Sequence, residues 1–182
     1  PHECSSAASD VYKRQVTQKK KNIIFVGKLN HSKGYDLFKE AILKILDEFP
    51  TWSSCTVGNE DRRSIYISHP RHKEFGFINH KATLNLLNTS EIAVVPSRWD
   101  EPFGRTALEA SSRGCATIIS NRGGLNETTD NAVKLKKLDS YSIYLEVKKL
   151  IKDPIKRKNL QRNGRKNVCL LYTSDAADEH SW

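Results

Sequence analysis

Two glutamates, Glu101 and Glu109, stand near the start of a predicted helix, where their carboxylates could contact a ligand. They enclose seven residues in the segment E-P-F-G-R-T-A-L-E. An ionised carboxylate offers two acceptor oxygens and no donor, so it can accept hydrogen bonds from paired sugar hydroxyls. Gly104, between the two, leaves the backbone free to approach a ligand closely. The residues alone also allow a plainer interpretation, in which Glu101 is an ordinary charge at a helix start and Glu109 a surface residue.

A second candidate is the loop at residues 27–34, with the sequence G-K-L-N-H-S-K-G. Backbone N–H groups and the positive end of a helix dipole favour an anion, and Lys28 and Lys33 add full charges, so a phosphate or diphosphate fits best. Taken alone, the loop is more simply explained by a turn at Gly27 and two solvated lysines. It matches neither a Walker A loop nor a G-x-G-x-x-G fingerprint, which argues against an ATPase or a simple NAD site.

The sequence predicts no metal site and no disulfide. The separations of the four central histidines match no ligand pattern (His31, His69, His72 and His80). The acidic pairs at residues 47–48 and 60–61 are most simply solvated. Cys55 and Cys115 have neither zinc-site spacing nor disulfide density, so we expect buried free thiols in a reducing cytosol.

Apolar, largely β-branched runs alternate with helical patterns along the chain. The run at residues 22–27, closed by Gly27, is typical of a strand buried on both faces. Ser32 is expected to cap the helix that follows, and Pro50 to end it. Further strands are expected at residues 54–57, 74–78, 91–96, 115–120 and 132–135. Helices are expected from residue 79 or 80, from residue 104 to about 112, and over residues 140–152 and 154–163.

This alternation predicts an α/β fold, a Rossmann-like parallel sheet with helices on both faces. Sheets of this kind bind ligands beyond the carboxyl ends of their strands. The loops at residues 27–34, 97–104 and 121–127 should therefore share one rim, where both candidate sites would meet.

The two ends of the chain differ from its middle. Residues 5–15 and 169–179 can be encoded by one DNA sequence and its reverse complement, which resembles the transposase mosaic-end adapter of sequencing libraries. We therefore expect residues 1–15 and 169–182 to be non-native tails. The native segment, residues 16–168, would then form a single Rossmann-like domain.

The net charge of +9 over 182 residues changes when the tails are set aside. Residues 1–15 contribute zero and residues 169–182 contribute −3, so the segment between them carries +12. Nine Lys or Arg lie within residues 148–166. A solvated helix face is the interpretation we favour, and the alternative is peripheral contact with an anionic membrane. No stretch approaches the roughly 18 apolar residues of a membrane span, and a cytoplasmic location is expected.

Four ordered motifs give the chain a resemblance to a known family. The segment from Glu101 to Glu109 resembles the E-x7-E motif of retaining GT-B glycosyltransferases of the group 1, family 4 type. F-V-G-K-L at residues 25–29, with Lys33 and Gly34, resembles the family's F-V-G-R-L and K-G segment. V-P-S at residues 95–97 precedes the glutamates, and G-G-L-N-E at residues 123–127 resembles the G-G-x-x-E that follows them. The resemblance covers only the C-terminal, donor-binding half of the family's enzymes.

The resemblance implies a role for each matching residue. Lys28 and Lys33 would neutralise the leaving diphosphate, and Glu109 would hold the ribose hydroxyls of the donor. Glu101, with the backbone at Phe103 and Gly104, would hold the donor sugar. Gly27, Arg105 and Thr106 complete the set of expected substrate contacts. The family is thought to retain anomeric configuration and to need neither a cofactor nor a divalent metal.

The function that the resemblance implies is transfer of a glycosyl group from a nucleoside-diphosphate sugar to a glycan or lipid-linked acceptor, as in cell-envelope polysaccharide synthesis. The N-terminal acceptor domain would be missing, so the chain alone should bind donor with little or no turnover. Two alternatives stand behind it. One is a non-catalytic basic Rossmann-like module that binds nucleotide or nucleic acid, although no nucleic-acid-binding signature is present. The other is a related GT-B enzyme such as a phosphorylase or epimerase.

Overall fold

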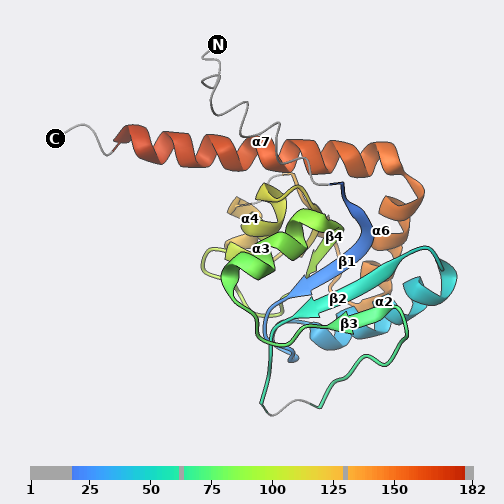
Figure 1. Cartoon of the computed structure of the whole chain (residues 1–182). Helices are drawn as coiled ribbons and strands as arrows, with labels where there is room; N and C mark the ends of the chain where they lie inside the picture. Colours follow the sequence, from blue (N-terminus) through green and yellow to red (C-terminus); the bar gives the residue numbers. More distant parts are fainter. Residues whose placement is uncertain (1–17, 62–63, 129–130, 179–182) are drawn as a thin grey trace.

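The computed structural model describes residues 18–61, 64–128 and 131–178, without the side chains of residues 127–128 and 167–178. Its centre is a six-stranded parallel sheet with the strand order β3-β2-β1-β4-β5-β6 (Figure 1). The strands are β1 (Lys20–Val26), β2 (Ser53–Val57), β3 (His72–Glu74), β4 (Ser90–Val95), β5 (Ala116–Ser120) and β6 (Val133–Leu135). The helices are α2 (Tyr35–Glu48), α3 (His80–Thr89), α4 (Arg105–Ser112), α5 (Leu125–Thr128), α6 (Ser140–Lys152) and α7 (Pro154–Asp178). The predicted α/β fold class is confirmed.

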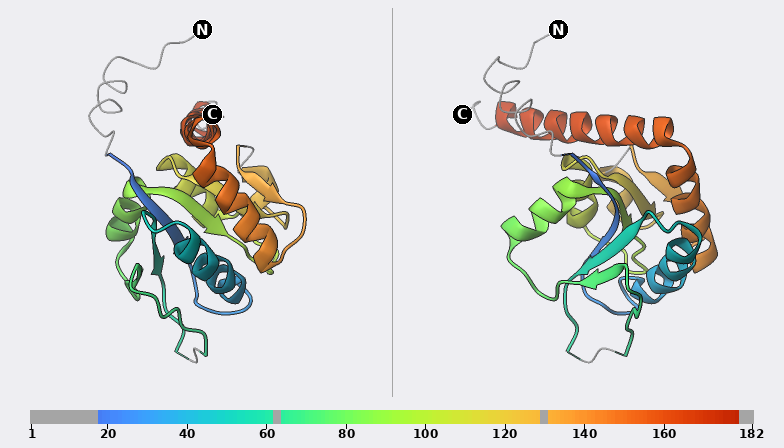
Figure 2. Two further views of the ribbon diagram at one scale, coloured as in Figure 1. Left: turned by 90° about the vertical axis from the view of Figure 1, so that its right-hand side faces the viewer. Right: turned by 45° about the vertical axis from the view of Figure 1, so that its right-hand side comes forward.

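Side chains of β1 alternate between the two faces of the sheet, as the pleat of a strand requires. Ile23 and Phe25 pack in the cluster that contains the buried residues of α2 and α6. Ile24 packs on the other face with Leu87 of α3 and Ala110 of α4. Both faces are therefore apolar, which explains why β1 is an unbroken hydrophobic run in the sequence. Figure 2 shows α2 and α6 side by side over one face.

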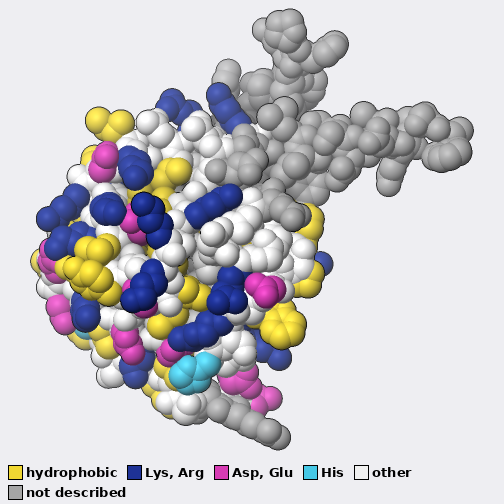
Figure 3. Space-filling model, turned by 180° about the vertical axis from the view of Figure 1, so that it is seen from behind, with side chains coloured by type: hydrophobic (Ala, Val, Ile, Leu, Met, Phe, Trp, Pro, Cys, Tyr) yellow, Lys and Arg dark blue, Asp and Glu magenta, His cyan; other side chains and the backbone are white. Residues whose placement is uncertain are grey.

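Lys and Arg side chains on the rear face of the molecule lie among acidic and hydrophobic ones and do not form a single stripe (Figure 3). Part of this charge is neutralised locally. Lys148 of α6 lies 2.8 Å from a carboxylate oxygen of Glu48, and Lys149 lies 2.6 Å from one of Glu146. Among the described residues no helix is both long enough and apolar enough to cross a membrane.

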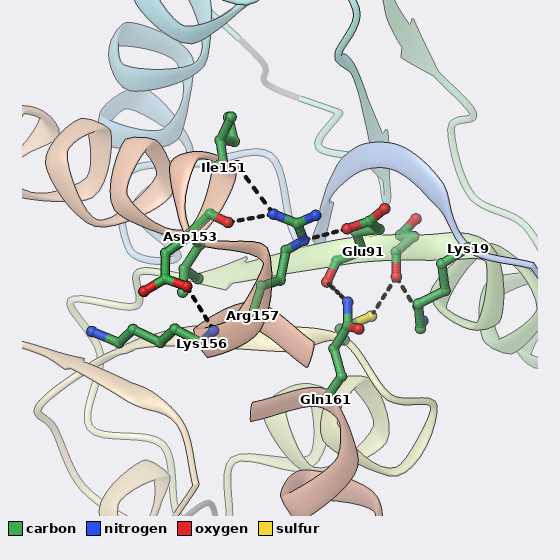
Figure 4. Close-up of polar contacts among 10 residues, drawn as sticks. Lys19, Glu91, Ile151, Asp153, Lys156, Arg157 and Gln161 are labelled. Atoms are coloured by element: carbon green, nitrogen blue, oxygen red, sulfur yellow. Dashed lines mark hydrogen bonds and ion pairs between the residues drawn. The ribbon is translucent and has the colours of Figure 1, made fainter. Parts of the chain in front are cut away.

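Helix α7 lies across the amino-terminal ends of the strands, and Arg157 anchors it there (Figure 4). The Arg157 guanidinium is buried, pairs through Nε with the carboxylate of Glu91 at the start of β4, and donates from Nη1 to the Leu150 and Ile151 carbonyl oxygens at the end of α6. Gln161 adds a bond to the Glu91 carbonyl oxygen at 2.9 Å. One arginine thus joins α6, α7 and β4.

Three expectations for individual elements are wrong. Ser32 does not cap α2, because the helix begins only at Tyr35 and the N-cap position is Gly34, which has no side chain to contribute. The expected strand at residues 74–78 is β3 at His72–Glu74; Gly76 then adopts a φ of +64° and turns the chain. The helix expected at residues 154–163 continues to Asp178.

The predicted tail at residues 1–15 lies outside the described residues, and that at 169–182 has no described side chains.

Burial of His72 makes stability depend on pH. Removal from water lowers the pKa of its imidazole from 6.5 to about 4, and Nδ1 lies 2.7 Å from the Ser54 hydroxyl. Between pH 6.5 and 4 the unfolded chain therefore binds more protons than the folded chain. As far as His72 is concerned, the free energy of unfolding is highest above pH 6.5 and decreases as the pH falls from 6.5 to 4. Because the ring is only part-buried, we expect a loss of about 1–2 kcal/mol.

The measurement is the free energy of unfolding from urea titrations between pH 7 and 4, for the natural chain and His72→Gln. Glutamine keeps a polar side chain but does not titrate, so the other ionisable groups cancel in the comparison. Parallel pH curves for the two proteins would contradict the prediction.

Candidate functional site

The three loops expected at one rim do meet at the carboxyl ends of the strands. The backbone N–H groups of Arg98 and Trp99 donate to the Ser32 carbonyl oxygen at 2.9 and 3.2 Å, which joins the loop after β4 to the loop after β1. Gly124 N–H donates to the Glu101 carbonyl oxygen at 2.7 Å, which joins the loop after β5. The rim is therefore one connected surface.

Glycines allow this close approach. A Cβ atom on Gly34, whose φ is +71°, would lie 2.0 Å from the Pro96 carbonyl oxygen. On Gly124 it would lie 2.5 Å from the Pro102 carbonyl oxygen. Neither distance leaves room for a side chain, so the glycines of the K-G and G-G motifs are explained by contacts between loops. The side chain of Glu127, the last residue of the second motif, is outside the described part of the chain.

Lys33 and Glu101 form the polar centre of the rim. The Lys33 ammonium pairs with Oε1 of Glu101, and the same oxygen accepts a hydrogen bond from the Ser97 hydroxyl at 3.0 Å. Both charged side chains are largely buried, with 31% of Lys33 and 19% of Glu101 exposed. Lys28 follows Gly27 at the end of β1 and is exposed, with no side-chain partner among the described residues. Two cationic groups are thus present in this loop, one paired and one open to solvent.

A cavity of about 760 Å³ lies beside α4 and brings together three of the sequence-predicted residues, Phe103, Arg105 and Glu109. Its other walls are mostly apolar: Val26, Phe77, Ile78, His80, Thr83, Leu108 and Ser112. The rings of Phe77 and Phe103 are 87% and 59% exposed. A cavity of this size with apolar walls and a carboxylate suits an organic ligand with a few polar groups. Thr106, the second residue of α4, is not among the lining residues.

Glu109 meets a histidine that the sequence did not indicate as a contact. Oε1 of Glu109 lies 3.0 Å from Nε2 of His80, the first residue of α3. Asn79 caps that helix by accepting from Ala82 N–H at 2.8 Å, which fixes the helix start and places His80 at the cavity. The side chain of Glu109 is 22% exposed and lines the cavity, so a ligand there can reach it.

The sequence interpretation also missed Asp36 and Arg98. Arg98 donates from Nη1 and Nη2 to the two carboxylate oxygens of Asp36, each at 2.6 Å. Burial opposes ionisation of Asp36, but the hydrogen bond and charge of Arg98 outweigh it and lower the pKa of that carboxyl. A signal was available, because Arg98 stood in one loop expected at the rim and Asp36 two residues beyond another, with the opposite charge.

No group of three or more potential metal ligands occurs in the part of the chain that the structure describes. Cys55 and Cys115 are buried free thiols, as predicted, and burial raises the pKa of each to about 11.

Comparison with known proteins gives a consistent result. The sequence model of a family described as "Glycosyl transferases group 1" matches residues 9–167. An uncharacterized glycosyltransferase of Methanocaldococcus jannaschii is 31% identical over 170 residues, which cover 88% of this chain and 43% of that protein. The glycogen synthase of Mycobacterium tuberculosis is 28% identical over 156 residues, or 80% of this chain and 37% of that protein. The chain thus spans less than half the length of these relatives.

Two solved structures share the fold. The C-terminal domain of a group 1 glycosyl transferase (LpcC) from Francisella tularensis superposes with a TM-score of 0.74 at 23% identity, covering 94% of each chain. HepE of Anabaena, solved with UDP and glucose, superposes with a TM-score of 0.70 at 19% identity, covering 99% of this chain and 53% of that one. Both carry the same parallel α/β architecture.

Proposed function

The chain belongs to the group 1 glycosyl transferases, and from that premise we propose that its cavity and rim bind a nucleoside-diphosphate sugar. The glycosyl group would pass to a glycan or lipid-linked acceptor with retention of configuration. The observation that supports this best is the arrangement around α4. Glu109 lies in a mostly apolar cavity on this helix, while the Lys33–Glu101 pair lies on the rim just before its start.

Each end of the donor has chemistry that suits one part of this arrangement. Glu109 would accept hydrogen bonds from the ribose hydroxyls, and the walls of the cavity would cover the nucleoside. The loop of residues 27–34 would take the diphosphate, since it precedes the N-terminus of α2 and carries Lys28 and Lys33. Glu101 and the backbone at Phe103 and Gly104 would hold the sugar.

The proposed chemistry depends on charge that develops in the transition state. Glycosyl transfer builds positive charge on the sugar ring and negative charge on the leaving diphosphate. A Lys33 ammonium held in place by Glu101 would stabilise that leaving group without reorganising at the moment of reaction. With two lysines to neutralise the diphosphate, we propose that no divalent metal is required.

The acceptor half of the reaction is proposed to require a second domain, because the relatives are more than twice the length of the matched segment. The isolated chain should then bind donor with little or no turnover.

The proposal predicts that Glu109→Ala lowers the affinity for the preferred nucleoside diphosphate at least about tenfold, because a carboxylate that accepts two hydroxyl hydrogen bonds is lost. Calorimetric titration with UDP, GDP and their sugars identifies the ligand first. The 2′-deoxy analogue of that ligand then tests the contact directly, since Glu109→Ala should remove most of the preference for the ribose form.

Glu146→Ala is the matched control, because it removes an equal charge from a residue of α6 that is similarly buried, 23% exposed, and does not line the cavity. Absence of binding by every nucleotide sugar would refute the proposal. The proposal would also be refuted if the Glu109→Ala variant still preferred the ribose form of the ligand to its 2′-deoxy analogue. Steeply salt-dependent binding to any DNA duplex would favour the nucleic-acid alternative instead.

A further inference from the structure

Arg98 holds the loop of residues 27–34 through more contacts than an ordinary surface arginine makes. Besides its two bonds to Asp36, its Nη1 donates to the His31 carbonyl oxygen at 2.6 Å. Its backbone N–H donates to the next carbonyl oxygen, that of Ser32, at 2.9 Å. Arg98 alone therefore donates to two consecutive carbonyl groups of the loop and to the carboxylate in the first turn of α2.

The loop is also shaped by its own backbone, since Gly34 N–H donates to the His31 carbonyl oxygen at 3.0 Å and Tyr35 N–H to that of Asn30 at 3.1 Å. Gly34 at the N-cap of α2 offers no side chain, so the start of the helix has no side-chain cap. Within the loop, Asn30 accepts from Lys33 N–H at 3.1 Å. Across to the neighbouring loop, Lys33 pairs with Glu101, and the Ser97 hydroxyl donates to the Ser32 carbonyl oxygen at 3.4 Å. The fork of Arg98, with its planar and fixed donors, ties the loop after β4 to the first turn of α2, directly after the loop of residues 27–34.

The Arg98 guanidinium is also poorly suited to bind phosphate itself. Both carboxylate oxygens of Asp36 neutralise it, and 37% of the Arg98 side chain is exposed against 19% of Asp36. Hydrogen bonding to Asp36 raises the pKa of Arg98 further, so the pair stays ionised. The charge that a diphosphate would meet comes from Lys28 and Lys33, which lie in the loop that Arg98 holds.

We propose that Arg98 is a positioning residue for the donor diphosphate, which acts through Asp36 and the carbonyl groups of His31 and Ser32 without touching the ligand. This inference rests on the proposed function. The pair would keep the loop in the one shape that presents Lys33 and the N-terminus of α2 to the two phosphates. Loss of the fork would allow the loop to move, and misplacement by about 1 Å is enough to weaken such an arrangement markedly.

A positioning role and a merely structural role predict different results. If Arg98 only supported the fold, its replacement would weaken every ligand equally or none at all. If it positions the phosphate loop, replacement weakens binding of the diphosphate but spares the nucleoside, since the cavity around Glu109 contains neither Arg98 nor Asp36.

The test compares the dissociation constants of UDP and uridine, or of GDP and guanosine if the natural chain prefers guanine, for the natural chain and four variants. Arg98→Ala and Asp36→Asn should lower the preference for the diphosphate over the nucleoside about tenfold and leave nucleoside binding unchanged. Arg98→Lys should recover little, because an ammonium group cannot form the fork. Arg122→Ala is the control. Arg122 lies on the same rim and its ion pair with Asp100 is long, at 3.9 Å, so the substitution removes an equal charge and should leave both dissociation constants unchanged.

Thermal unfolding of each variant is followed in parallel. If Arg98→Ala does not fold, Arg98→Lys and Asp36→Asn provide the comparison. An unchanged preference for the diphosphate, or equal weakening of both ligands, would overturn the inference. A natural chain that itself shows no preference for the diphosphate would overturn the proposed function instead, so the two failures are distinguishable.

Discussion

Replacing Gly34 with alanine is expected to lower the free energy of unfolding by about 3 kcal/mol. The residue adopts a φ of +71°, which costs a non-glycine residue about 1–2 kcal/mol. The new methyl group would also lie 2.0 Å from the Pro96 carbonyl oxygen and 3.1 Å from the Pro96 ring. Relief of that overlap requires the loops after β1 and β4 to separate, at an overpacking cost of about 1–3 kcal/mol.

Gly76→Ala is a close control. Gly76 has nearly the same backbone conformation, with a φ of +64°, but a Cβ atom there would meet nothing within 4 Å. It should therefore show only the backbone cost of about 1–2 kcal/mol. Urea titrations of both variants measure the difference, which is the contribution of the contact between loops. Equal destabilisation by the two substitutions would show that the contact with Pro96 is unimportant.

Replacing Arg157 with alanine should have a larger effect, a loss of about 3–5 kcal/mol in the free energy of unfolding. Only 7% of Arg157 is exposed, and 16% of the Glu91 side chain. The substitution leaves a carboxylate buried without its partner and two carbonyl groups at the end of α6 without their donor. It also removes the guanidinium from the face of Trp52, where its centre lies 5.3 Å from the ring centroid. Against a total stability of about 5–15 kcal/mol, this could unfold the chain at 37 °C.

Arg162→Ala, an exposed position on the same helix, is the control for helix propensity and charge and should be nearly silent. Chemical denaturation at 15 °C keeps the destabilised variant measurable. The double variant Arg157→Leu, Glu91→Leu should be less destabilised than Arg157→Ala, because no unpaired charge remains buried. A double variant that is less stable than the single one would argue that hydrogen bonding, and not the lost ion pair, decides the outcome.

The fold was largely predictable because its central strands are buried on both faces. β1, β4 and β5 are runs of apolar residues closed by Gly27, Pro96 and Asn121, and each lies where the sequence placed it. The failure at residues 74–78 has a definite cause. Phe75, Phe77 and Ile78 are apolar because they pack against a helix or line a cavity. The spacing of apolar residues in the sequence cannot by itself distinguish such a segment from a strand.

Neighbouring residues of the candidate site were proposed from the sequence where one segment carries them, and contacts were missed where two distant segments share them. Glu101 and Glu109 lie on either side of one helix start, so a local motif indicated both. The partner of Arg98 lies 62 residues away, and that of Glu109 lies 29 residues away. No spacing in the sequence specifies which side chains two distant loops bring into contact. The pairing depends on the strand order, which the sequence did not indicate.

Strand β4 joins the two regions on which the largest effects are expected. Glu91, the partner of Arg157, stands at its beginning, and Pro96, the neighbour of Gly34, directly follows its end. Five residues of extended chain separate them by about 16 Å, a distance at which the effects of substitutions usually add. The strand acts as a rigid spacer between the end that anchors α7 and the end that carries the rim loops. Substitutions in the rim loops at one end of β4 should therefore leave the anchoring of the helices at its other end intact.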